Sequence, residues 1–140
     1  MTSGYFFEDL YVGQTATLSK TITEQDLLMY SAVCLDTNPI HMDDAVARQS
    51  RFGGRVAHGM LSAGLIAALL GTRLPGPGTI YMRQSLKFCA PVKIGHTVDA
   101  VVEITDLNLP RKSATLRTRC MVKEGLVIDG EAMVLVPTRD

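Results

Sequence analysis

Residues 58–73 read HGMLSAGLIAALLGTR, and this stretch decides the fold. No charged side chain lies between its first and last residues, and nearly every position is apolar or small. A helix that is apolar around its whole circumference is buried on every side, so we expect a central, enclosed helix here. The Pro- and Gly-rich residues 74–78 (LPGPG) cannot continue a helix and should end it.

Patterns of period two follow this helix to the end of the chain. Alternating residues over 97–104 and 114–123 predict two strands, and residues 80–88 and 126–136 predict two more. Gly130 is a candidate bulge in the last strand. Four antiparallel strands bury such a helix best if their sheet curls around it, which predicts an α+β fold class with an antiparallel sheet wrapped around a long central helix. A second copy could cover the sheet edge, so we also expect a homodimer.

The N-terminal third carries weaker signals. Residues 15–22 predict a short strand. Thr23 predicts a helix N-terminus, and this helix should end near Leu35 because the Asn-Pro pair at 38–39 favours a turn. Residues 43–50 predict another one or two helical turns.

Length and composition indicate one globular domain over residues 1–140. The chain is 46% hydrophobic and 20% charged, and a domain of this size needs neither metal nor disulfides to fold. Lys and Arg number 14, as do Asp and Glu, so the net charge of +0 lacks the basic surplus of a general nucleic-acid binder. The longest apolar stretch is about 14 residues, shorter than the roughly 20 that span a bilayer. We therefore expect a cytoplasmic protein without a membrane segment.

The three cysteines, Cys34, Cys89 and Cys120, lie far apart and lack C-x-x-C spacing. This pattern predicts buried thiols in a reducing compartment, and it does not favour a zinc site.

One turn brings an acid and a base close together. Asp36 and His41 flank the sequence Thr-Asn-Pro-Ile, in which the proline stiffens the chain. Two such side chains aimed at one water are suited to general acid–base catalysis. The alternative is ordinary turn chemistry, in which Asp36 caps backbone N–H groups.

The start of the central helix offers a second candidate site. The free N–H groups of a helix N-terminus carry partial positive charge, and Gly59 would let the oxygen of an ester or thioester approach them. His58 is expected to be a helix-terminal residue rather than a catalyst. A stripe of residues along one face of the helix would then line the binding site of an acyl chain. The alternative is that these residues only pack in the core. The stripe consists of Gly59, Ala63, Ile66 or Ala67, and Leu70.

Together these motifs carry a family resemblance. The sequence DTNPIH at 36–41, followed by AHGM at 57–60, resembles the MaoC-like, (R)-specific enoyl-CoA hydratases of the hot dog fold, and most closely the subgroup that supplies polyhydroxyalkanoate synthesis. The similarity extends through residues 74–81 and 84–88. Many members have Gly directly before this Asp, where the present chain has Leu35. A leucine would be strained there if the position needs a positive φ.

The resemblance implies syn addition of water to a trans-2-enoyl-CoA, giving an (R)-3-hydroxyacyl-CoA. Carried over, Asp36 would act as general base on the water, and His41 would hold the water and pass a proton to the alpha carbon. The Gly59 amide would stabilise the enolate-like thioester oxygen, and Asn38 would help to hold the turn and the water at the substrate. No metal or redox cofactor is implied, since CoA is part of the substrate, and the family commonly forms homodimers.

Two other functions would also need an acyl-CoA pocket. One is a hot dog thioesterase, and the other is a non-catalytic module that binds or senses acyl-CoA. The Asp36–His41 pair favours hydration over both, because hydration needs a base and a proton donor across a double bond.

Overall fold

Five antiparallel strands form one sheet in the order β1-β3-β4-β5-β2. The structure is a computed structural model that describes residues 4–139. The alternating sequence positions become alternating buried and exposed faces along β3 and β4. The strand bounds are Thr15–Thr21 (β1), Ile80–Phe88 (β2), Thr97–Asn108 (β3), Ser113–Val122 (β4) and Gly125–Leu135 (β5).

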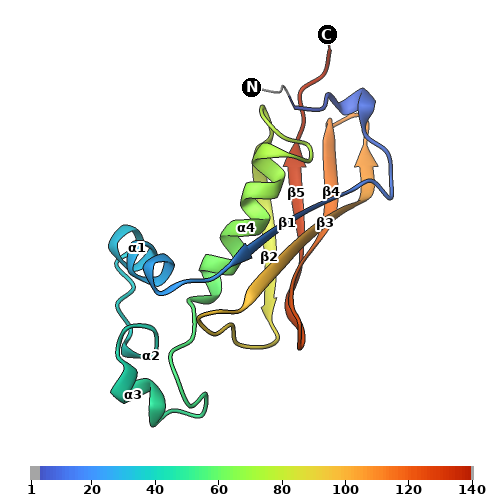
Figure 1. Cartoon of the computed structure of the whole chain (residues 1–140). Coiled ribbons are helices and arrows are strands. Elements are labelled where there is room, and N and C mark those ends of the chain that lie inside the picture. The colour runs from blue at the N-terminus through green and yellow to red at the C-terminus, as the bar shows by residue number, and fades with distance from the viewer. Residues whose placement is uncertain (1–3, 140) are drawn as a thin grey trace.

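The long helix α4, Gly59–Thr72, lies along one face of this sheet (Figure 1). It contacts β1, β2, β3 and β4, and its Ile66, Leu69 and Leu70 are almost fully buried among the inward-facing strand residues. The predicted α+β architecture, a sheet around a long central helix, is confirmed. Burial of the helix on every side is wrong for the single chain, because Gly64 is exposed and Met60 keeps 52% of its surface exposed. The sheet covers only one side of the helix.

Three shorter helices lie in the chain between β1 and α4, to one side of the sheet (Figure 1). Helix α1, Glu24–Cys34, begins at the predicted N-cap Thr23, whose hydroxyl accepts the Asp26 N–H. Helix α2, Pro39–Met42, replaces the predicted turn, because Pro39 takes the first helical position, where no N–H is needed. Helix α3 spans Asp44–Arg48, and a 3₁₀ turn, η1, spans Phe7–Asp9.

Gly130 does not form the predicted bulge. Its pairing with Thr118 on β4 and Leu86 on β2 continues the regular register of both strand pairs. A Cβ atom at Gly130 would lie 2.0 Å from the Ser85 carbonyl oxygen. Glycine is needed here because the two backbones approach closely.

The cysteine prediction is correct for one residue of three. Cys120 is buried on β4, and burial raises the pKa of its thiol to about 12. Cys34 and Cys89 are exposed, because they lie at the end of α1 and just beyond β2. Over residues 4–139, no helix combines the length and the apolar character needed to cross a bilayer.

Candidate active site

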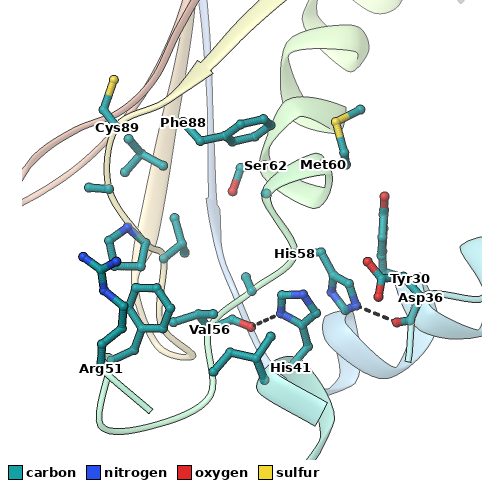
Figure 2. A pocket seen from close by; sticks show the side chains of 18 residues that line it. Tyr30, Asp36, His41, Arg51, Val56, His58, Met60, Ser62, Phe88 and Cys89 are labelled. Atoms are coloured by element: carbon teal, nitrogen blue, oxygen red, sulfur yellow. Dashed lines mark hydrogen bonds between the residues drawn. The ribbon is translucent and has the colours of Figure 1, made fainter. Parts of the chain in front are cut away.

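A pocket of about 580 Å³ opens where α4 begins (Figure 2). Segments far apart in the sequence meet around it: Tyr30 of α1, Asp36 and His41 of the segment that follows α1, residues 56–60 at the start of α4, and the end of β2. Both members of the predicted acid–base pair, Asp36 and His41, line this pocket.

The Asp36 side chain is fixed at one of its oxygens. Its Oδ1 accepts the backbone N–H of Asn38 at 3.2 Å, which is a local turn bond of the kind that the sequence allowed. Asp36 remains exposed and lines the pocket, so the turn bond and a role toward a ligand are compatible.

The His41 ring is held by a backbone carbonyl. Its Nδ1 lies 2.7 Å from the Val56 carbonyl oxygen, which can only accept, so Nδ1 carries the hydrogen. In the neutral ring Nε2 is then the free base. Asp36, His41 and His58 each place one polar atom within 4.8 Å of the others. The carboxylate and the imidazole can therefore share one small molecule such as water.

His58 is the residue that sequence reasoning missed. It is 2% exposed, and its Nε2–H donates to the Asp36 carbonyl oxygen at 2.9 Å. The Ser31 hydroxyl donates to the same oxygen at 2.8 Å. The His58 ring also stacks on the His41 ring, with 4.0 Å between centroids and 30° between planes. One buried histidine thus positions both predicted catalytic residues.

A signal for His58 was present in the sequence. It is the N-cap residue of α4 and makes no capping hydrogen bond, whereas N-caps are normally Ser, Thr, Asp or Asn. A histidine at an N-cap position therefore indicates a role other than capping the helix.

The two histidines and Asp36 are poorly arranged for a metal ion. Imidazole lone pairs lie in the ring plane, so two stacked rings direct them within two separate planes rather than toward one centre. A zinc ion needs its nitrogen ligands converging at about 2.0–2.1 Å. His58 Nε2 is also already engaged by the Asp36 carbonyl. The arrangement is better suited to proton transfer.

Gly59 opens α4 at the wall of the pocket. As the first helical residue it has no carbonyl partner one turn earlier within the helix, so its N–H is available to a ligand. A Cβ atom there would lie 2.6 Å from the Phe88 ring, so only glycine allows this contact. The helix N-terminus adds partial positive charge.

The remaining predicted substrate contacts lie elsewhere. Asn38 caps α2 through its Oδ1, which accepts the Ile40 N–H at 3.1 Å, and it is outside the pocket lining. Ala63 and Leu70 are packed in the core and Ala67 is half-buried, all three outside the lining. The apolar part of the pocket lining comes from other segments: Val56, Ala57, Phe88, Val92 and Val127.

A sequence profile described as a MaoC like domain matches residues 11–125. The chain belongs to the MaoC-like family. An (R)-specific enoyl-CoA hydratase of Rhodospirillum rubrum is 53% identical over 135 residues, covering 96% of this chain and 94% of the relative. The unliganded R-hydratase PhaJ1 of Pseudomonas aeruginosa superposes with a TM-score of 0.92 at 42% identity, covering 97% and 88% of the two chains.

A second solved structure is similarly close to this chain in fold and sequence. The (R)-hydratase of Aeromonas caviae, involved in PHA biosynthesis, has a TM-score of 0.90 and 44% identity, covering 93% of this chain and 99% of the other. The hot dog fold expected from the resemblance is confirmed.

This MaoC-like chain is strained next to Asp36. Leu35 adopts φ 65° and ψ 13°, the left-handed region, and its N–H closes α1 on the Ser31 carbonyl at 2.8 Å. Such a conformation costs a non-glycine residue about 1–2 kcal/mol. Leu35 is 81% exposed, so it offsets little of this cost by packing.

We expect Leu35→Gly to raise the free energy of unfolding by about 0.5–1 kcal/mol, because glycine adopts a positive φ freely but is more flexible when unfolded. Urea unfolding followed by circular dichroism measures this change. Leu35→Ala keeps the strain and is the matched control. Equal stability of the Gly and Ala variants would contradict the strain at this position.

Proposed function

We propose that the protein is an (R)-specific enoyl-CoA hydratase that adds water to a trans-2-enoyl-CoA and forms an (R)-3-hydroxyacyl-CoA. The observation that carries this proposal is the placement of the Asp36 carboxylate and the His41 imidazole in one pocket with the Gly59 N–H. Relatives named as (R)-specific enoyl-CoA hydratases, at 53% and 44% identity, support it.

The geometry suggests how water is added. Water bound between Asp36 and His41 loses a proton to this pair as its oxygen attacks C3. The electron pair of the double bond moves toward the thioester oxygen, whose charge the Gly59 N–H and the α4 N-terminus stabilise. The pair then returns a proton to C2 on the same face, which gives syn addition.

The reaction needs no metal or redox cofactor in this proposal, because water, a base and a proton donor suffice. We also propose a homodimer. Strand β2 is at an edge of the sheet and exposes apolar side chains in the single chain, as does the uncovered side of α4. A second copy would bury both. These exposed side chains are Ile80, Tyr81, Met82, Phe88 and Met60.

The position of Arg51 supports a substrate whose acyl group is attached to a negatively charged carrier such as CoA. It lines the pocket on the side opposite Asp36 and lies over the Phe52 ring at 5.6 Å (Figure 2). Within residues 4–139, Arg51 has no ion pair, whereas Arg55 pairs with two carboxylates, at 2.7 and 3.0 Å. An unpaired guanidinium there suits the phosphates of CoA.

Arg51→Ala is expected to raise KM for crotonyl-CoA roughly five- to tenfold with kcat unchanged, because a contact remote from the reacting atoms contributes equally to ground and transition states. KM for crotonyl-pantetheine, which lacks phosphate, should stay the same. Arg48→Ala, an exposed arginine outside the pocket lining, is the control. A similar rise in KM for both thioesters would exclude phosphate recognition.

The direct test of the function uses purified protein and crotonyl-CoA. Loss of the enoyl-thioester absorbance, with a product that an (R)-specific 3-hydroxyacyl-CoA dehydrogenase oxidises, is the expected result. Release of free CoA would instead indicate a thioesterase. Saturable binding without turnover at any chain length would indicate a binding or sensing module.

A further inference from the structure

The Ser62 hydroxyl is a buried polar group without a partner. Ser62 lies on α4 and is 1% exposed, and its Oγ makes no hydrogen bond to any described residue. A buried hydroxyl left unpaired costs about 1–3 kcal/mol. The folded chain therefore tolerates a destabilising feature at this position.

Within the helix, a backbone carbonyl could in principle accept a hydrogen bond from the Ser62 hydroxyl. A serine or threonine within a helix can donate to the carbonyl four residues earlier. Thr72, on the same helix, does so, and its Oγ1 donates to the Ala68 carbonyl at 2.6 Å. Ser62 makes no such bond, so its hydroxyl is directed away from the helix backbone. Figure 2 shows it pointing off α4 into the pocket, near Phe88.

The helix geometry directs this hydroxyl toward Gly59. Residues three apart lie on one face of a helix, and each Cα–Cβ bond tilts toward the N-terminus. Ser62 therefore leans over the turn that begins at Gly59, which has no side chain of its own. Both residues line the same pocket.

No acceptor among the described residues pairs with the Ser62 hydroxyl. Phe88 lies near it in Figure 2, and Val92 and Val127 are further apolar residues of the same pocket lining. In apolar surroundings a hydrogen bond to a developing charge is stronger than in water. The missing acceptor is thus expected to be an atom of the ligand.

We propose that the Ser62 hydroxyl donates a second hydrogen bond, beside the Gly59 N–H, to the thioester oxygen of the substrate. This inference rests on the proposed hydratase function. As the water oxygen bonds to C3, the double-bond electrons move toward C2 and the thioester oxygen gains negative charge. Ser62 stabilises that oxygen and keeps its own proton. When C2 is protonated, the carbonyl forms again and the hydrogen bond weakens.

Two kinetic variants test the role of the hydroxyl. Ser62→Ala is expected to lower kcat for crotonyl-CoA by on the order of 10²-fold, which is the usual effect of losing one donor to such an oxygen. Its free energy of unfolding should stay the same or rise, because the alanine removes an unpaired polar group. Ser62→Thr keeps a hydroxyl and should retain most of the activity.

Ser113→Ala is the matched control. Ser113 is 5% exposed on β4 and lies outside the pocket lining, so this variant should keep the wild-type kcat. Wild-type kcat in Ser62→Ala would overturn the proposal, and so would an equal loss in the Ala and Thr variants, which would indicate packing rather than hydrogen bonding.

A binding measurement separates this inference from the hydratase proposal. Acetoacetyl-CoA forms an enolate that absorbs in the near ultraviolet, and donors to its thioester oxygen increase the enolate fraction. Wild-type protein should raise this absorbance on binding, and Ser62→Ala should raise it much less. Equal signals in the two proteins, including no signal in either, would overturn the role of Ser62. Failure of the wild type to hydrate crotonyl-CoA, with the signal difference intact, would overturn only the hydratase.

Discussion

Replacement of Asp36 by Asn is expected to lower kcat for hydration of crotonyl-CoA by on the order of 10²–10⁴-fold. Asparagine keeps an oxygen that can accept the Asn38 N–H, so the turn before α2 can persist. It removes the negative charge and the capacity to take a proton from water. The loss should therefore appear in kcat, with folding unchanged by circular dichroism.

Asp43→Asn is the control for this variant. Asp43 belongs to the same segment and caps α3 through bonds to two backbone N–H groups, and it is outside the pocket lining. Asparagine caps helices as well as aspartate does, so this variant should remain active and folded. Full activity in Asp36→Asn would exclude Asp36 as the general base.

His41→Ala is expected to lower kcat by a similar 10²–10⁴-fold. The Val56 carbonyl fixes Nδ1 as the protonated atom, so alanine removes the one free ring nitrogen of His41 that could share water with Asp36. The measurement is the initial rate of absorbance loss at saturating crotonyl-CoA, for the variant and the wild type.

His96 provides the matched histidine control. It lies outside this pocket, with its Nε2 3.7 Å from Glu124, so His96→Ala should retain wild-type kcat. Unchanged kcat in His41→Ala would contradict an acid–base role for His41 and leave Asp36 to act alone.

Local patterns in the sequence were sufficient for most of the fold. The N-cap at Thr23 and the alternation along β3 and β4 each arise from neighbouring residues, and the structure confirms them. Helix α2 was missed because a single helical turn begins with the same Asn-Pro signal as an ordinary turn. Local sequence does not separate the two.

The site was only partly predictable for a different reason. Asp36 and His41 are close in sequence, so their meeting in one pocket follows from one short segment. The role of His58 depends on its contact with a carbonyl 22 residues earlier, and the pocket walls come from α1, α4 and the sheet. Such contacts are set by tertiary packing, which periodicity does not encode.

The segment that carries Asp36 and His41 has few buried residues in contact with the rest of the fold. Between residues 32 and 55 only Ala47 is buried, and α2 and α3 lie apart from the sheet (Figure 1). Parts of a protein with few buried contacts open at a lower free energy than the core. Amide hydrogen exchange in the single chain should therefore be much faster here than in β4. The temperature range of catalysis would then be limited by local opening of this segment while the sheet remains folded.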